Sequence, residues 1–318
     1  MILKKPKFWD FKKPNFFAYL LYPFTIFVKI NNIISSLIPK KKFTEIKTLC
    51  VGNLYVGGTG KTPTSLLLYN LLKKMNINPV TAKKFYNNQM DEQKLLKDNS
   101  NFISLTDRKK IVKKAIDMKF DMIIFDDGLQ EKWIDYDIKF ACFDGEKWIG
   151  NGHLIPSGPL REKIDTIKNY HGIFLKTVNE DTNLDYIFNK IRNINPNIEI
   201  FETIIEIKNI NQFNINKNYI IFSGIGNPDS FKKLLLKNQF KIIEEIIFPD
   251  HYNYQDKDIS EIINKANSNN SEIITTEKDF NRIPQKFKEK ISFLEINIKI
   301  KDETRLIQFL KTKINEIN

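Results

Sequence analysis

The sequence predicts a layered α/β fold, and two observations lead to that class. Short apolar segments typical of buried strands alternate along the chain with segments typical of helices. One strand-to-helix junction, at residues 57–62, combines three glycines with a lysine and two threonines. Because glycine contributes only 12 of the 318 residues, this cluster indicates a place where the backbone needs an unusual conformation.

Composition excludes several classes of protein. Hydrophobic residues make up 42% of the chain, which is enough for a sizeable core and excludes a disordered or collagen-like protein. Two cysteines, Cys50 and Cys142, are too few to staple a secreted fold of this length, so we expect reduced thiols. The three histidines are far apart, and no zinc-binding spacing is present. The net charge of +12 favours an anionic partner: nucleic acid, anionic lipid or a phosphorylated substrate.

The first 45 residues predict a segment that lies in a membrane interface. An apolar, aromatic-rich run extends from Phe16 to Val28, with lysines before it and Pro39-Lys40-Lys41-Lys42 after it. The run is shorter than the roughly 20 residues needed to cross a bilayer, and no signal-peptide cleavage site follows. An amphipathic helix at the membrane surface fits this pattern. A helix packed on the protein's own core is the alternative.

Strands and helices are then predicted in alternation. A strand at 46–51 precedes the glycine cluster and a helix at 62–74 follows it, since Pro63 is tolerated in a first helical turn. The other predicted strands are 121–126, 139–143, 171–175, 199–207, 219–223 and 273–276, and the other predicted helices are 109–119, 229–238 and 303–316. We divide the chain into an N-terminal segment (1–45), a first domain (46–205) and a second α/β domain (206–318).

The glycine cluster predicts a nucleotide-binding loop. In Gly57-Gly58-Thr59-Gly60-Lys61-Thr62, glycines let backbone N–H groups close around phosphate oxygens, and the following helix adds its positive dipole. Lys61 is expected to reach the β- and γ-phosphates, and the Thr62 hydroxyl to coordinate Mg²⁺. The usual loop pattern has a glycine at the position of Tyr55, and here two glycines lie inside the loop instead.

A second motif predicts the partner of this loop. Residues 122–125 are apolar and lead into Asp126, Asp127 and Gly128. Nucleotide-binding proteins with such a loop hold Mg²⁺ near an aspartate at a strand end, although strand-end aspartates also cap helices. Together the two motifs imply chemistry on a Mg²⁺–nucleoside triphosphate, and they leave the acceptor of the phosphoryl group open.

Six motifs identify a family when they are taken together. The most distinctive are Gly-Gly-Thr-Gly-Lys-Thr-Pro at 57–63, Pro-Ser-Gly-Pro-Leu-Arg-Glu at 156–162 and Phe-Pro-Asp-His at 248–251, and the others lie at 126–130, 223–228 and 275–279. In this order they resemble the tetraacyldisaccharide 4′-kinase family, from about residue 6 to 283. The resemblance implies transfer of phosphate from ATP to the 4′-hydroxyl of a tetraacylated glucosamine disaccharide 1-phosphate, which gives lipid IVA in lipid A biosynthesis.

The resemblance also implies an architecture and a location. Two Rossmann-like, P-loop-type α/β domains would enclose a cleft, and an N-terminal amphipathic helix would hold the protein on the cytoplasmic face of the bacterial inner membrane. ATP and Mg²⁺ are the expected cofactors. The disaccharide lipid and the membrane surface are the expected partners, without nucleic acid, and we expect a monomer.

Site residues follow from the resemblance. Gly57, Gly58, Thr59, Gly60, Lys61 and Thr62 would bind the nucleotide, and Thr62, Asp126, Asp127 and Glu162 would lie at the metal. Asp91 would be the base toward the sugar hydroxyl, with Lys61 and His251 completing the catalytic set. A neighbouring imidazolium would lower the pKa of Asp91 whereas burial would raise it, and both outcomes remain open at this point.

Three departures from the family concern the substrate side. Lys83-Lys84-Phe85-Tyr86 stands where the family has Gly-Tyr-Gly-Arg, Gln93 replaces a proline, and Glu131 replaces a frequent histidine. They bear on substrate contacts near residues 83–93. Thr276, Glu277, Lys278 and Asp279 have no role from the residues alone. Two other functions compete with the kinase: an ATPase without a sugar acceptor, and a lipid-binding relative that has lost catalysis.

Overall fold

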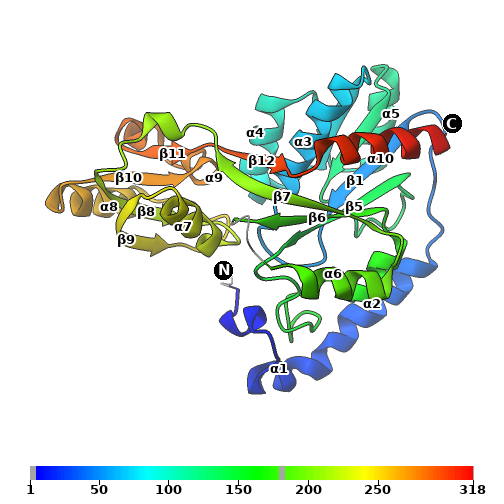
Figure 1. The fold of residues 1–318 in the computed structure, drawn as a ribbon, viewed down its shortest axis with the longest axis horizontal. Coiled ribbons are helices and arrows are strands. Elements are labelled where there is room, and N and C mark those ends of the chain that lie inside the picture. Colours follow the sequence, from blue (N-terminus) through cyan, green and yellow to red (C-terminus); the bar gives the residue numbers. More distant parts are fainter. Residues whose placement is uncertain (1–4, 179–182, 318) are drawn as a thin grey trace.

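Two sheets with mainly parallel strands, each covered by helices on both faces, make up most of the protein, which confirms the predicted α/β class (Figure 1). This computed structural model describes residues 5–178 and 183–317. The first four residues of the predicted membrane segment therefore lie outside the described residues. The part with the larger sheet occupies the right of Figure 1, and the smaller sheet projects to its left.

The larger sheet has eight strands in the order β12-β7-β6-β5-β1-β4-β2-β3. All neighbours are parallel except the pair formed by β12 and β7. The strands are β1 (Lys47–Gly52), β2 (Pro79–Lys84), β3 (Phe102–Leu105), β4 (Met122–Asp126), β5 (Ile138–Asp144), β6 (Gly172–Thr177), β7 (Glu199–Ile207) and β12 (Ile296–Ile300). Their inner residues are almost continuously apolar, as expected for a sheet covered on both faces. Cys50 and Cys142 are free and buried within it.

Helices cover both faces of this sheet. They are α3 (Lys61–Lys74), α4 (Met90–Asn99), α5 (Arg108–Asp117), α6 (Asp185–Ile194) and α10 (Glu303–Glu316). α3 and α10 bury leucines such as Leu72 and Leu310 on one face. α5 and α6 bury Ile111 and Ile191 on the other face. Helices on both sides of a parallel sheet follow from right-handed crossover connections.

The smaller sheet repeats this arrangement with four parallel strands in the order β11-β10-β8-β9. Its strands are β8 (Asn218–Ser223), β9 (Lys241–Ile247), β10 (Ser271–Thr276) and β11 (Ser292–Leu294), and its helices are α7 (Pro228–Lys237), α8 (Asp256–Ser268) and the short α9 (Glu277–Phe280). α8 buries Ile259 and Ile262 on one face, and α7 buries Phe231 and Leu235 on the other. Each sheet therefore has its own core.

The chain returns to the first sheet at its end, which differs from the predicted domain limits. We expected residues 206–318 to form one domain, but β12 pairs with β7 and α10 packs beside α3. Figure 1 shows α10, in red, lying across the larger sheet. The reason is burial: Leu306 and Leu310 complete an apolar face of the first sheet that α3 covers only in part. An amphipathic pattern reveals that a helix has a buried face, but not which sheet covers it.

The N-terminal segment forms a nearly continuous helix on the outside of the molecule. It consists of α1 (Phe16–Leu21), a 3₁₀ turn (Tyr22–Phe24) and α2 (Thr25–Leu37). Together they span 22 residues with a mean hydropathy of 1.3, enough by length and composition to cross a membrane. Most of the large apolar side chains are exposed, among them Phe16, Phe17, Leu20, Phe27, Ile30, Ile33, Ile34 and Leu37. The helix is thus longer than the apolar run that we read from the sequence.

The opposite side of this helix is attached to the folded body. Asn32 donates a side-chain hydrogen bond to the carbonyl of Arg161 at 3.0 Å, and Lys132 donates one to Asn31 at 3.0 Å. Ser157 donates to the carbonyl of Ala18 at 2.6 Å. These contacts are spread along the helix, so they hold it against the surface of the first domain.

We predict that the last helix stabilises the first domain. Leu310→Ala should lower the free energy of unfolding by roughly 2–5 kcal/mol, the usual cost of a cavity at a fully buried leucine. The neighbouring exposed position supplies a control, since Lys311→Ala should change it by less than about 0.5 kcal/mol. Urea denaturation followed by circular dichroism measures both values. Equal effects of the two substitutions would contradict the packing of α10 on this sheet.

Candidate functional site

The predicted site residues gather at the carboxyl ends of the central strands of the first sheet. β1 leads into the glycine loop, β4 ends at Asp126, β2 ends beside Lys83, and β5 ends at Asp144. In open α/β sheets this edge is where ligands bind, because the strand ends leave a crevice at the point where strand order reverses. Here the order reverses at β1, which lies between β5 and β4.

The glycine loop has the backbone that an anion-binding loop needs. Gly57 and Gly60 have φ values of +137° and +86°, a region that favours glycine. The Asn53 amide holds the loop from inside by donating to the Tyr55 carbonyl at 2.5 Å and the Thr59 hydroxyl at 3.0 Å. α3 begins directly after the loop at Lys61, so its N-terminal N–H groups face the same space.

Asp126 lies at the centre of the polar groups below the loop. It is fully buried, and its two oxygens accept hydrogen bonds from the hydroxyls of Thr62 and Ser65, both at 3.1 Å. Lys83 adds a third hydrogen bond at 2.8 Å. Because a buried charge must be paired and hydrogen-bonded, this carboxylate is held in one position next to the loop.

Asp127 faces the cleft beside Lys61. Its backbone has a φ of +59°, and its carboxylate lies 3.8 Å from the Lys61 ammonium and 3.2 Å from the Arg161 guanidinium. Burial would raise the pKa of this carboxyl, but Lys61, Arg161 and Lys83 lower it to about 2. Asp127 is therefore ionised at neutral pH and available to a cation.

A chain of charges, buried at Asp126 and Lys83 and partly buried at Glu92 and Lys278, crosses from the first domain to the second. Lys83 bridges Asp126 and Glu92, at 2.8 and 2.5 Å, and the other oxygen of Glu92 binds Lys278 of α9 at 2.5 Å. Burial would raise the pKa of Glu92, but the two lysines hold it well below its usual range. We call Asp126, Lys83, Glu92 and Lys278 the ion chain. It places α4 of the first domain against α9 of the second.

Asp91 and His251 meet next to this chain. The Asp91 Oδ1 atom lies 3.3 Å from His251 Nδ1, and Asp91 Oδ2 lies 3.5 Å from the Arg282 guanidinium. Burial would raise the pKa of Asp91, but His251, Lys278 and Arg282 lower it. Burial would lower the pKa of His251, but Asp91, Asp250 and Glu92 raise it. The neighbouring charges therefore outweigh burial, which favours a carboxylate paired with an imidazolium.

One oxygen of this pair is left without a hydrogen bond. Asp91 Oδ2 is buried and accepts no hydrogen bond from the described residues. A buried acceptor without a partner is costly, and such atoms are expected where a ligand will supply the donor. The nearest charged partner of this oxygen is the Arg282 guanidinium at 3.5 Å, which is longer than a hydrogen bond.

The second domain holds His251 in an unusual backbone conformation. His251 has a φ of +57°, and its N–H donates to the carbonyl of Gly224 at 3.1 Å. Arg282 donates to the same carbonyl, also at 3.1 Å. Asp279 fixes this region in turn, because it accepts hydrogen bonds from the Gly224 N–H and the Tyr254 hydroxyl. The motifs at 223–228 and 275–279 therefore position His251 and Lys278.

Glu162 makes no direct hydrogen bond with the other predicted metal ligands among the described residues, and Gln130 and Arg161 stand between it and Asp127. Its carboxylate accepts a hydrogen bond from Gln130 at 2.9 Å, and burial raises its pKa. Among the described residues no group of three or more histidine, cysteine or acidic side chains is arranged to hold a metal ion. The oxygen donors next to the glycine loop are Thr62, Asp126 and Asp127.

The two domains enclose a cleft of about 770 Å³. Its walls include the whole loop from Gly57 to Thr62, Asp127, Glu92, His251 and Lys278. On the second-domain side, Gly226 packs so closely on the loop that an added Cβ would lie 2.6 Å from the Gly58 nitrogen. A side chain at this position would push the domains apart, so glycine permits the cleft to close here.

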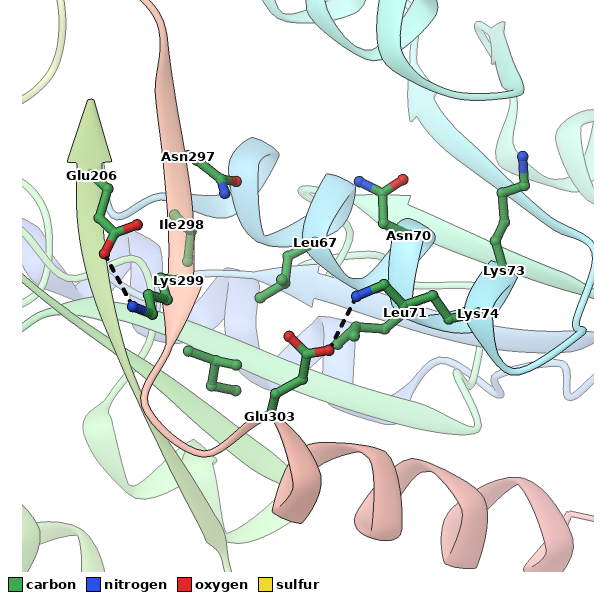
Figure 2. Close-up of a pocket in the computed structure, with 11 residues that line it drawn as sticks. Leu67, Asn70, Leu71, Lys73, Lys74, Glu206, Asn297, Ile298, Lys299 and Glu303 are labelled. Carbon is green, nitrogen blue, oxygen red and sulfur yellow. Dashed lines mark hydrogen bonds and ion pairs between the residues drawn. The ribbon is translucent and has the colours of Figure 1, made fainter. Parts of the chain in front are cut away.

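A smaller groove of about 580 Å³ lies between α3, β12 and the start of α10 (Figure 2). Four of its charges are paired with one another, Lys74 with Glu303 at 3.2 Å and Lys299 with Glu206 at 3.5 Å. It contains none of the predicted site residues. The larger cleft is therefore the candidate site.

Four charged residues beside the predicted site were given no role in the sequence analysis. Lys83 was noted only as a departure from the family, and Glu92 was given no role. Lys176 and Asp144, which form a pair at 2.9 Å below Gly58, were not considered. Asp144 carries the same signal as Asp126, an aspartate at the end of an apolar strand, and it was available to the same argument.

Comparisons with known proteins agree with each other. The sequence model of a family described as Tetraacyldisaccharide-1-P 4′-kinase matches residues 17–315. A tetraacyldisaccharide 4′-kinase of Pelagibacter ubique (strain HTCC1062) is 46% identical over 318 residues, which cover 100% of both chains. One from Rickettsia bellii (strain OSU 85-389) is 32% identical over 294 residues, covering 87% of this chain and 89% of the relative.

A solved structure has the same fold. A crystal structure of LpxK from Aquifex aeolicus in complex with ATP superposes with a TM-score of 0.68 over 93% of this chain and 99% of that chain. Its sequence identity is 22%, so this likeness concerns the arrangement of the two sheets and their helices.

The charges around His251 predict how stability depends on pH. A histidine whose folded pKa is raised above 6.5 stabilises the fold below that pH, and the contribution is lost as pH rises through the folded pKa. His251→Asn, which tolerates the positive φ, should therefore cost most unfolding free energy near pH 6 and least above the folded pKa. His171 has a lowered pKa, so the cost of His171→Asn should instead decrease as pH falls. Denaturation at a series of pH values measures both trends. If the cost of His251→Asn also decreased as pH falls, the pairing of His251 with the surrounding acids would be contradicted.

Proposed function

The chain belongs to the tetraacyldisaccharide 4′-kinase family, and from this premise we propose the roles of the residues in its cleft. The enzyme phosphorylates the 4′-hydroxyl of tetraacyldisaccharide 1-phosphate with ATP, a step of lipid A synthesis. The observation that carries our assignment is the Asp91–His251 pair, in which the buried Oδ2 of Asp91 accepts no hydrogen bond and has only an ion pair with Arg282 at 3.5 Å.

The glycine loop binds the phosphates of ATP in this proposal. Its N–H groups and the N-terminus of α3 surround the phosphate oxygens, and Lys61 neutralises the charge that passes to the leaving diphosphate. The loop from Gly57 to Thr62 supplies this contact. Lys61 is free to move toward phosphate, because its distance of 3.8 Å from Asp127 is longer than a hydrogen bond.

The oxygen donors beside the loop fit Mg²⁺. Thr62 offers a hydroxyl, and Asp126 and Asp127 offer carboxylates at the end of β4. Mg²⁺ prefers oxygen ligands and usually takes one or two protein carboxylates together with phosphates and water. When bound, it would neutralise charge on the phosphate oxygens. We leave Glu162 outside this set, since Gln130 holds its carboxylate and burial raises its pKa.

Asp91 receives the proton of the sugar hydroxyl. The lowered pKa keeps Asp91 ionised, so Oδ2, which accepts no hydrogen bond and lies 3.5 Å from Arg282, can accept one from the 4′-hydroxyl and point the nucleophile at the γ-phosphate. Phosphoryl transfer proceeds through a loose transition state in which orientation matters more than early deprotonation, so a weak base suffices. His251 keeps Asp91 charged and in place.

The acceptor is a lipid, and the exposed N-terminal helix is the part suited to reach it. Its outer side presents side chains such as Phe17, Phe27 and Ile34. Lys40, Lys41 and Lys42 follow and suit an anionic lipid surface. We propose that the helix lies in the interface, since its contacts with the body along its length oppose a transmembrane orientation. The protein would then be peripheral on the cytoplasmic face of the inner membrane.

Transfer of labelled γ-phosphate from Mg-ATP to tetraacyldisaccharide 1-phosphate in detergent micelles tests the assignment. Labelled lipid is expected with the unaltered enzyme. Hydrolysis of ATP that is indifferent to the lipid would favour the ATPase alternative. Binding of ATP without transfer would favour a non-catalytic relative.

Asp91→Asn should reduce lipid phosphorylation by roughly 10²–10⁴-fold, the usual contribution of a positioned base. Because this residue faces the acceptor rather than the glycine loop, the dissociation constant for Mg-ATP should stay within about two-fold. Asp98→Asn changes an exposed aspartate on the same helix and should leave turnover unaltered. Turnover of the Asp91 variant near that of the Asp98 variant would refute the base assignment.

Replacing Phe17, Phe27 and Ile34 together by serine should weaken membrane binding at least about ten-fold, because each loses apolar area that a bilayer would bury. Flotation with vesicles of phosphatidylethanolamine and phosphatidylglycerol measures the bound fraction. A double variant with Tyr186→Ser and Leu236→Ser removes exposed apolar residues elsewhere and should float like the unaltered protein. Equal flotation of the two variants would exclude the helix as the membrane contact.

A further inference from the structure

The first described residues of the chain contact Tyr55, two residues before the glycine loop. Tyr55 occupies the position where the usual loop pattern has a glycine, and it is only 2% exposed. Its hydroxyl donates a short hydrogen bond to Asp10 and accepts one from Lys5 at 2.7 Å. Lys5 and Asp10 also form an ion pair at 2.5 Å. In this trio of Lys5, Asp10 and Tyr55, the tyrosine hydroxyl both donates and accepts a hydrogen bond.

The Tyr55 side chain packs against the glycine loop from outside the cleft. A Cβ added to Gly57 would lie 3.4 Å from the Tyr55 ring, so the ring packs next to the residue with the most unusual backbone of the loop. Tyr55 is absent from the lining of the cleft, whereas Val56 and Gly57 belong to it. Glycines have no side chain to hold their conformation, so a loop of this kind depends on the groups packed around it.

Asp10 connects the loop with the second domain as well. Its other oxygen lies 3.3 Å from Lys147, and Lys147 lies 3.4 Å from Asp229 at the start of α7. The neighbouring Asn227 donates to Asp144 at 2.8 Å. The N-terminal segment, the glycine loop and α7 therefore meet at one group of charges.

A second line of contacts runs through the Pro-Ser-Gly-Pro loop. Trp9 donates its indole N–H to the carbonyl of Pro156 at 3.0 Å, and Asn151 donates its N–H to the Trp9 carbonyl at 3.0 Å. The same loop accepts a backbone hydrogen bond from Val56 at Pro159, at 2.9 Å. Residues 5–10 are thus docked on the two segments that shape the first half of the glycine loop.

We propose that Asp10 and Tyr55 are positioning residues for ATP binding: docking of the N-terminal segment, which carries the membrane helix, holds the glycine loop in its phosphate-binding conformation. The inference rests on the proposed binding of ATP at this loop. It extends that proposal by linking nucleotide affinity to a segment outside the nucleotide-binding domain.

The physical reason is the loss that follows when one partner is removed. Without the Asp10 carboxylate, the buried Tyr55 hydroxyl and the Lys5 ammonium lose their acceptor and must find water or another partner. Tyr55 then shifts, and the backbone of Gly57 shifts with it. Small displacements of N–H groups weaken phosphate binding, because the loop acts by its preset geometry.

The test compares nucleotide affinity and lipid affinity in the full-length enzyme in detergent. We expect Asp10→Asn and Tyr55→Phe each to raise the dissociation constant and the KM for Mg-ATP roughly ten-fold, the scale of one hydrogen bond to a charged group. The KM for the lipid should stay within about two-fold. The double variant should bind ATP as weakly as either single variant, since both remove the same contact. Isothermal titration calorimetry with Mg-ATP and steady-state kinetics give these values.

Asp117→Asn and Tyr186→Phe are exposed matched controls and should leave both constants unchanged. If Asp10→Asn fails to fold, the isosteric Tyr55→Phe variant carries the test alone. Unchanged ATP affinity in folded variants, or equal increases in both KM values, would overturn the inference. Absence of ATP binding in the unaltered enzyme would instead refute the proposed function, so the two failures are distinguishable.

Discussion

The need to neutralise charge in a dry environment constrains this site more than any other interaction. Asp126 is completely buried, and the lysine that balances it is buried as well. Lys83 requires a second acid, Glu92, and Glu92 in turn requires Lys278 from the other domain. Removal of one member of such a chain leaves an unpaired charge in a low dielectric, which costs far more than an exposed ion pair contributes. The catalytic geometry of the first domain therefore depends on a residue of the second.

The same constraint explains why Asp91 and His251 are held where they are. Both lie next to the end of the ion chain, and the positive charges of Lys278 and Arg282 keep Asp91 ionised despite its burial. His251 gains its charge from the surrounding acids. The field of the whole cluster thus sets the protonation of the pair, and neither residue would have the same pKa alone.

The sequence predicted the local chemistry of the fold better than its long-range arrangement. The glycine loop, the strand ending at Asp126 and the α/β alternation are short-range patterns, and each has a physical cause within a few residues. The return of α10 to the first sheet, the role of Lys83 and the contact between Glu92 and Lys278 depend on residues far apart in the sequence, for example 186 positions for Glu92 and Lys278 and 229 positions for Lys74 and Glu303. A resemblance to a family suggested that Asp91 and His251 act together. Only the three-dimensional structure shows the distance between them and the Oδ2 atom that accepts no hydrogen bond.

The return of the chain to the first sheet has a mechanical consequence. The second domain is attached at both its ends, through the segment after β7 and the one before β12, and these two segments are hydrogen-bonded to each other. Lys208 donates its N–H to the Glu295 carbonyl at 2.8 Å, and the Asn209 side chain contacts the backbone of Phe293 and Glu295 at 2.9 Å. Two adjacent, hydrogen-bonded connections restrict how the second domain can turn relative to the first more than a single linker would. This double connection helps to keep His251 and Lys278 of the second domain facing Asp91 and Glu92 of the first.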